Sequence, residues 1–174
     1  MNPARERIII VDRSNRKTGV VERAEMRRCN HIHRASYILV FNCSGELFLQ
    51  KRTDCKDIYP GRYDIAAGGV VLAGESYEQS AERELSEELG IEKVPLIRHF
   101  DHFYRDTHNQ VWGRIFSCLH EGPFVLQQEE VASGRFLPLA AILSMMRSPQ
   151  QFTPDGIEIL TRFCQTEHPG PDQG

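Results

Sequence analysis

The stretch Gly69–Ile91, which reads GVVLAGESYEQSAERELSEELGI, constrains the fold of this chain most. Ser76, with Gln79 three residues later, forms an S-x-x-Q capping box that begins a helix. Gly90 suits the left-handed residue that follows a last helical turn. Between these two signals, apolar residues recur at helical spacing, at Ala81, Leu85 and Leu89. The stretch therefore predicts a helix over residues 76–89 with one face in the core.

The same helix carries a dense group of acids. Glu84, Glu87 and Glu88 point into an arc of about 100°, and on a bare helix the i,i+4 pair would repel by roughly a few tenths of a kcal/mol. A solvated acidic surface is the ordinary interpretation of such a run. That interpretation does not explain the Gly-Gly pair before the acids or Glu75 at the helix entrance. A divalent cation explains them better, because hard cations bind several carboxylate oxygens together with substrate phosphate.

These positions resemble the Nudix box, G-x5-E-x7-R-E-U-x-E-E-x-G-U, in which U is a bulky aliphatic residue. Every fixed position is matched, by Gly69, Glu75, Arg83, Glu84, Leu85, Glu87, Glu88, Gly90 and Ile91. The resemblance implies an α+β Nudix fold, with a mixed sheet between helices and an N-terminal strand extension. It also implies a structural role for Glu75, Arg83 and Gly90, with Arg83 pairing with a box carboxylate such as Glu75.

The resemblance further implies a magnesium-dependent hydrolase that cleaves a diphosphate linkage, with Mn²⁺ as a possible substitute. The implied metal ligands are Glu84, Glu87, Glu88 and the backbone carbonyl of Gly69. A metal would stabilise charge on the phosphoryl oxygens, while a carboxylate takes the proton of the attacking water. The general base is one of several candidates. These are Glu87, Glu88 and the pair Glu129 and Glu130, which precede a strand expected at 131.

The substrate is weakly encoded. Arg52, Lys56 and Arg62 are gathered in one stretch and are the candidates for binding phosphate, although an exposed edge is equally consistent with each of them. A formal net charge of -3 offers no basic excess for a nucleic-acid backbone. A small organic diphosphate, such as a nucleoside diphosphate derivative, is therefore expected rather than a nucleic-acid polymer.

The resemblance extends to most of residues 5–165. Segments such as HRASYILVFN and YPGRYD resemble isopentenyl diphosphate isomerases and, more closely, the YfcD-type Nudix proteins. Isomerases place a catalytic cysteine just before the box glycine and a metal-binding histidine just after it, where this chain has Gly68 and Val70. His33 matches another isomerase metal histidine, but a hydrogen-bonded core histidine explains it as well. Without that cysteine the chain lacks the acid that protonates the alkene in isomerases, which favours hydrolysis on an isomerase-like scaffold.

A third alternative is a non-catalytic Nudix module that senses a nucleotide. Such modules commonly lose box acids, and this chain keeps all of them. Retained acids favour the enzyme over the sensor.

The rest of the chain predicts strands and helices without βαβ alternation, as in α+β folds. Strands are expected at residues 7–12, 20–21, 35–42, 46–51, 63–67, 96–105, 110–120 and 131–137, and further helices at 138–146 and 154–164. We expect an N-terminal extension packed on the domain (1–32), a Nudix domain (33–165) and a flexible tail (166–174).

The five cysteines are odd in number and form no CxxC pair, which favours free thiols in a reducing cytoplasm. No apolar run approaches the length of a membrane span, and no signal-peptide core is present. A homodimer is expected by analogy with many Nudix proteins, with the first strand as one possible contact.

Overall fold

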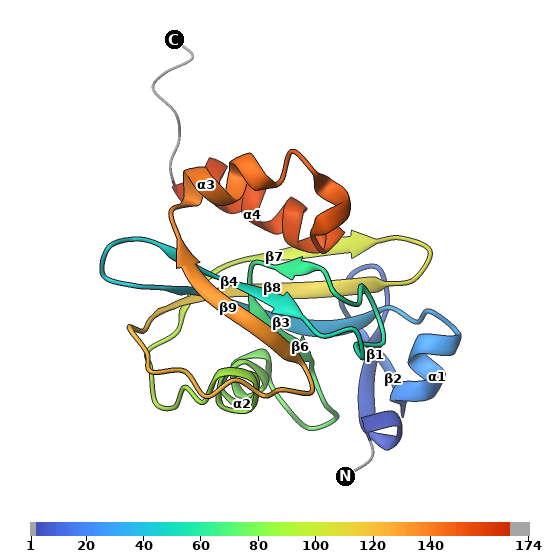
Figure 1. Ribbon diagram of the computed structural model, residues 1–174. Helices are drawn as coiled ribbons and strands as arrows, with labels where there is room; N and C mark the ends of the chain where they lie inside the picture. Colours follow the sequence, from blue (N-terminus) through green and yellow to red (C-terminus); the bar gives the residue numbers. More distant parts are fainter. Residues whose placement is uncertain (1–2, 168–174) are drawn as a thin grey trace.

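The computed structural model describes residues 3–167 and has a mixed β-sheet between layers of helices (Figure 1). Its strands are β1 (Arg7–Val11), β2 (Lys17–Glu22), β3 (His33–Phe41), β4 (Leu47–Arg52), β5 (Tyr63–Asp64), β6 (Ala67–Val70), β7 (Ile97–Arg105), β8 (Gln110–Leu119) and β9 (Val131–Leu137). Its helices are α1 (Arg23–Arg28), α2 (Tyr77–Leu89), α3 (Leu139–Met145) and α4 (Pro154–Glu167), with 3-10 turns at η1 (Pro3–Arg5) and η2 (Pro149–Gln151). The α+β class with a sheet sandwiched by helices is confirmed.

The central strand β3 divides the sheet into two parts. It pairs in parallel with β8 from His33 to Phe41 and antiparallel with β6 from Ala35 to Ile38. It meets β4 only at Phe41↔Leu47, while β4 pairs instead with β5 and β9. β3 and β4 therefore diverge from their common turn, and the space between them becomes important for the site.

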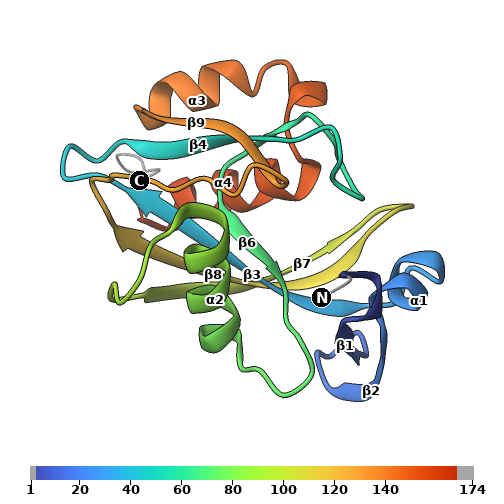
Figure 2. The ribbon, with the colours of Figure 1, turned by 60° about the horizontal axis from the view of Figure 1, so that its bottom comes forward.

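Each face of β3 supports a separate core. Ile38 and Val40 pack on the side of α2, together with Ala81 and Leu85. Leu39 packs on the opposite side with residues of α3 and α4 such as Ile142. A strand buried on both faces needs apolar residues at nearly every position, which explains the continuous apolar run in the sequence. Figure 2 shows α2 lying across its face of the sheet, away from α3 and α4.

The N-terminal segment packs against the edge of this sheet. β1 pairs with β2 along its length and meets β3 at Ile10↔His33. Ile8, Met26 and Val70 form a small core beneath α1. No helix in the described part of the chain is long and apolar enough to cross a membrane. The five cysteines are free thiols, as predicted.

Several predicted boundaries are wrong, among them the strand expected at 20–21, which runs from Lys17 to Glu22. The strand expected at Tyr63–Ala67 is two strands, because Tyr63 and Asp64 pair with β4 whereas residues 67–70 cross over to β3. The last helix runs to Glu167, so the tail expected at 166–174 begins inside α4. Phe163 stacks on Phe41 at 5.7 Å and anchors this part of the helix on the sheet. Residues 168–174 of that predicted tail lie outside the described residues.

The predicted capping of the box helix is confirmed. The Ser76 hydroxyl accepts a hydrogen bond from the Gln79 backbone N–H at 3.1 Å, and the Ser76 N–H donates to the Gln79 side chain at 2.9 Å. Gly90 ends the helix with φ at 68°. Both ends of the acidic helix are therefore fixed by local sequence.

Replacing Ser76 with alanine should lower the free energy of unfolding by about 1 kcal/mol, because the N–H of Gln79 loses its acceptor. Urea unfolding of the metal-free protein would measure this. Ser86→Ala is the matched control, since Ser86 is exposed in the middle of the same helix and alanine favours helix there. Equal effects of the two substitutions would contradict a capping role.

Candidate active site

Two box acids are buried against the backbone of β6. Glu84 and Glu88 are 8% and 4% exposed, one helical turn apart on α2. The Gly68 N–H donates to Glu88 Oε2 at 3.1 Å. A Cβ on Gly69 would lie 2.4 Å from Glu84 Oε1. A side chain at the box glycine would therefore displace the Glu84 carboxylate from its present position.

Burial and mutual repulsion oppose ionisation of this pair. Burial raises the pKa of Glu88 to about 8, with Glu84 and Glu130 adding to the rise and Lys56 opposing it. Burial also raises the pKa of Glu84, against the influence of Arg83. Two buried carboxylates this close are costly unless a cation compensates them.

Arg83 supplies part of that compensation and shapes the box. Its Nε donates to Glu75 at 2.7 Å, which is the pairing that the resemblance implies. Its Nη1 donates to Glu84 at 2.7 Å and to Glu87 at 3.1 Å, and its Nη2 donates to the Val70 carbonyl at 3.2 Å. Glu87 is half exposed, so of the three predicted acidic ligands it is the one nearest to solvent.

Lys56 supplies a second cation from a distant loop. Its ammonium forms an ion pair with Glu130 and lies 3.6 Å from Glu88 Oε1. Burial alone would raise the pKa of Glu130, but the Lys56 charge outweighs it and holds that pKa below its ordinary value. The structure thus brings Glu84, Glu88 and Glu130 into one electrostatic group. The exposed Glu129 is outside that group, although it lines an adjacent hollow together with Glu130 and Lys56.

The donor set fits a hard divalent cation. Among residues 3–167, no three acid, histidine or cysteine side chains already surround a single point as a finished metal site. The oxygens are instead held by the cations of Arg83 and Lys56, which stand in for metal charge. Carboxylates and a backbone carbonyl are the ligands that magnesium accepts.

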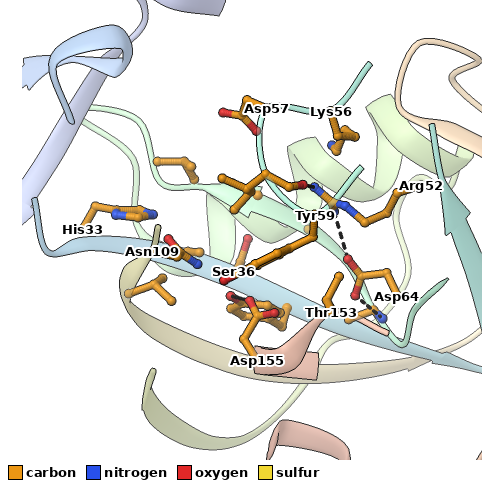
Figure 3. Close-up of a pocket in the computed structure, with 18 of the residues that line it drawn as sticks. His33, Ser36, Arg52, Lys56, Asp57, Tyr59, Asp64, Asn109, Thr153 and Asp155 are labelled. Carbon is orange, nitrogen blue, oxygen red and sulfur yellow. Dashed lines mark hydrogen bonds and ion pairs between the residues drawn. The ribbon is translucent and has the colours of Figure 1, made fainter. Parts of the chain in front are cut away.

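A narrow polar cavity adjoins these acids, with room of about 70 Å³ for water-sized occupants, and it widens at its open mouth. It opens where β3 and β4 diverge, and Gly68, Gly69 and Lys56 connect it to the acid group. Figure 3 shows Asp64, Thr153 and Asp155 along one side, His33 and Asn109 along another, and Lys56 with Asp57 across from Asp155. A ligand with a diphosphate at the acids could extend an organic group into this cavity.

The predicted phosphate-binding residues differ in their surroundings. Arg52 lines the cavity and pairs with Asp64 at 2.9 Å, and its Nη2 donates to the Ile58 carbonyl. Lys56 also lines the cavity, whereas Arg62 is not among its lining residues. Arg62 donates to the Phe152 carbonyl and lies over the Tyr59 ring.

Several lining residues were missed by reading the sequence. Two of them, Tyr37 and Asp155, meet through a hydrogen bond of 2.7 Å across 118 residues of sequence. Arg27 comes from α1 and pairs with Asp57 at 2.9 Å. For Tyr37 and Asp155 the sequence signals were the likenesses of HRASYILVFN (residues 33–42) and FTPD (residues 152–155) to YfcD-type proteins, and these likenesses give no role.

His33 is buried in the cavity wall as a neutral ring. Burial and the nearby Arg27 cation lower its pKa to about 3. Its Nδ1 lies 3.1 Å from the His31 carbonyl, which can only accept, so Nδ1 carries the proton. A hydrogen-bonded wall residue accounts for this environment.

His33 should make the protein sensitive to acid. Between about pH 3 and 6.5 the unfolded chain binds a proton at His33 that the folded protein does not. The free energy of unfolding therefore falls as pH drops through this window, by up to about 1.4 kcal/mol per unit. His33→Asn should reduce that slope, measured by urea unfolding at several pH values. His108→Asn, at an exposed histidine, should leave it unchanged. Identical slopes for wild type and His33→Asn would exclude the effect.

Comparisons with known proteins agree on one family. The family model described as NUDIX domain matches residues 31–163. An uncharacterized Nudix hydrolase of Pseudomonas aeruginosa is 43% identical over 158 residues, covering 91% of this chain and 93% of the relative. The uncharacterized Nudix hydrolase YfcD of Escherichia coli K12 is 40% identical over 160 residues, covering 92% of this chain and 87% of the relative.

Solved structures agree on the fold. The crystal structure of DR0079 from Deinococcus radiodurans superposes with a TM-score of 0.80 at 21% identity, covering 90% of this chain and 98% of that one. The NUDIX domain of Shewanella oneidensis NrtR, solved with ADP ribose, gives a TM-score of 0.61 at 16% identity and covers 84% of this chain and 99% of its own.

Proposed function

The chain belongs to the Nudix hydrolase family, whose members act on phosphoanhydride bonds, and from this we propose that it is a magnesium-dependent hydrolase of a nucleoside diphosphate derivative or a similar organic diphosphate. The observation that carries the proposal is a group of acids at the edge of a polar cavity, formed by the buried Glu84 and Glu88 and the partly buried Glu130.

Glu84 and Glu88 would hold the metal, with Glu87 and the Gly69 carbonyl completing the protein's ligands. Bound there, Mg²⁺, or Mn²⁺ in its place, would stabilise charge on the phosphoryl oxygens and lower the pKa of the attacking water. Arg83 keeps the box in shape through Glu75 and the Val70 carbonyl. Family members generally use divalent metals, and the choice of magnesium rests on the all-oxygen donor set.

Glu130 is the base that we propose. It is held ionised by Lys56, whereas burial raises the pKa of Glu88 and Glu87 is committed to Arg83 in a half-exposed pair. Water attacks one phosphorus and gives its proton to Glu130, and the bond from that phosphorus to the bridging oxygen breaks as the second phosphate leaves. Lys56 would bind a phosphate oxygen of the substrate, since its ammonium already lies beside Glu88 and Glu130.

The nucleotide part of the proposal draws on fold neighbours. Their names include an NrtR domain complexed with ADP ribose and an Ap4A hydrolase of C. elegans, which covers 76% of this chain with a TM-score of 0.56. ADP ribose and Ap4A are both nucleotide derivatives with linked phosphates. The homodimer, the cytoplasmic location and the division into an extension (1–32) and a domain (33–165) remain predictions.

The test is phosphate release from a panel of nucleoside diphosphate derivatives and prenyl diphosphates, with and without magnesium. Turnover of at least one panel member only in the presence of metal is expected. Tight binding of a nucleotide without turnover would contradict the hydrolase and indicate a sensing module. Interconversion of isopentenyl and dimethylallyl diphosphate would indicate an isomerase instead.

A further inference from the structure

Lys56 and Asp57 are neighbours in the loop between β4 and β5, and their side chains reach opposite charges on different parts of the fold (Figure 3). Lys56 pairs with Glu130 and lies 3.6 Å from Glu88 Oε1. Asp57 Oδ2 accepts a hydrogen bond from Arg27 Nε of α1 at 2.9 Å. The loop therefore connects the N-terminal extension to the acids of the proposed metal site, across 30 residues of sequence on one side and 74 on the other.

The arginines that hold Asp57 stand on a fixed support. Arg27 Nη1 also donates to the buried Asn109 at 3.4 Å, and Arg23 Nε approaches Asp57 Oδ2 to 3.9 Å as a second cation. Between the two arginines, the buried Met26 anchors α1 in the small core of the N-terminal segment. Partial burial raises the pKa of Asp57, but the charges of Arg27 and Arg23 outweigh it and hold that pKa below its ordinary value. The contact of Asp57 with α1 is therefore charge-assisted on both sides.

The loop has no regular structure of its own. Residues 53–62 form neither helix nor strand. The Thr53 N–H donates to the Glu130 carbonyl at 3.0 Å and fixes one end, but the Lys56 N–H reaches the Thr53 carbonyl only at 3.5 Å. A lysine side chain has a long flexible stem, and a hollow with room of about 440 Å³, lined by α1 and by this loop, lies next to it. Side-chain contacts of the loop therefore decide whether Lys56 stays among the acids.

We infer that Asp57, held by the two arginines of α1 that approach it, is a positioning residue that keeps Lys56 among the acids of the active site. The inference rests on the hydrolase proposed above, in which Lys56 binds a phosphate oxygen of the substrate. It goes beyond the family resemblance, because Arg23 and Arg27 precede residues 31–163, which the family model matches. The N-terminal extension thereby becomes part of the active site rather than only a cover for the edge of the sheet.

Chemical labelling of lysines tests the position of Lys56 without any substrate. The metal-free protein is treated with a trace of acetic anhydride, and acetylation of each lysine is measured by mass spectrometry. In the wild type, Lys56 should react at least about tenfold more slowly than the exposed Lys17 and Lys93, because its side chain is only 14% exposed and its ion pair must first break. Asp57→Asn should make Lys56 react at least about threefold faster, with labelling of Lys17 and Lys93 unchanged.

Asp54→Asn is the matched control, because Asp54 is an exposed acid of the same loop, three residues before Asp57. Labelling of Lys56 in this variant should be the same as in the wild type. Arg27→Gln removes the nearest cation from Asp57 and should speed the labelling of Lys56 as Asp57→Asn does. That variant carries the test if Asp57→Asn does not fold, as judged by thermal melting.

Activity shows whether Asp57 acts through Lys56. For the diphosphate of the panel that the wild type cleaves, Lys56→Met should lower kcat/KM at least about tenfold and Asp57→Asn at least about threefold. The double variant should be no slower than Lys56→Met alone, because Asp57 then has no ammonium to position. A residue that only stabilises the fold would lower kcat/KM further in the Lys56→Met background.

Unchanged labelling of Lys56 in folded Asp57→Asn and Arg27→Gln would overturn the inference, as would wild-type labelling of Lys56 at the rate of Lys17. Effects of Asp57→Asn and Lys56→Met on kcat/KM that simply multiply would also overturn it. Turnover of a panel diphosphate together with any of these results would keep the hydrolase and reject the positioning role. Faster labelling of Lys56 in Asp57→Asn, without metal-dependent turnover of any panel member by the wild type, would reject the hydrolase and keep Asp57 as the residue that positions Lys56.

Discussion

Replacing Glu88 with glutamine is expected to lower kcat for the cleaved diphosphate by at least about 10³-fold, because several kcal/mol of charge stabilisation depend on the metal that it would hold. Folding should survive. Glutamine can still accept the Gly68 N–H and removes a carboxylate that repels Glu84 and Glu130. Phosphate release and thermal melting, each with and without magnesium, measure both effects.

Thermal melting separates a metal ligand from a merely structural acid. Magnesium should raise the Tm of the wild type by mass action and raise that of Glu88→Gln much less. Glu82→Gln is the matched control, since Glu82 is an exposed acid of the same helix, and it should behave as wild type in both assays. A magnesium-induced shift that is the same in Glu88→Gln and wild type would mean that the metal binds elsewhere.

Replacing Gly68 with alanine should destabilise the protein by at least about 3 kcal/mol, and an unfolded product would be consistent with this. A Cβ at Gly68 would lie 2.0 Å from the Ser36 carbonyl oxygen, which is backbone of the central strand and cannot rotate away. The φ of 147° is also unfavourable for any residue with a side chain. Urea unfolding measures the loss.

A matched control distinguishes the steric clash from the strained dihedral. Gly45 has a φ of 75° but open space around its missing Cβ. Gly45→Ala should therefore cost only about 1 kcal/mol. Comparable losses at the two positions would show that backbone strain alone, and not the contact with Ser36, makes Gly68 necessary.

The same contact bears on the isomerase alternative. A cysteine at position 68, where isomerases carry their catalytic thiol, would place its Cβ on the Ser36 carbonyl just as alanine would. The pairing of β3 with β6 therefore leaves no space for a cysteine side chain at position 68. An isomerase activity would need another acid in this cavity.

The sequence by itself determined the box helix, and its acids suggested the metal-binding chemistry that we propose. Ser76, Gln79 and Gly90 act within a few residues of one another, so their hydrogen bonds and dihedral angles follow from local spacing. The pairing of Arg83 with Glu75 is also local, since Glu75 lies in the loop just before α2 and Arg83 lies eight residues later within that helix. The continuous apolar run of β3 likewise predicted a strand that is buried on both faces.

Only the tertiary structure decided what surrounds those acids. Lys56 reaches Glu130 across 74 residues of sequence, and Tyr37 reaches Asp155 across 118. The divergence of β3 from β4 creates the cavity, and it results from strand pairing by β6 and β9 that no local pattern specifies. The sequence predicted phosphate binding for both Arg62 and Arg52. In the structure Arg62 does not line the cavity and donates to the Phe152 carbonyl instead. Burial and long-range contacts set these charges and directions, and both arise only when distant segments of the chain pack together.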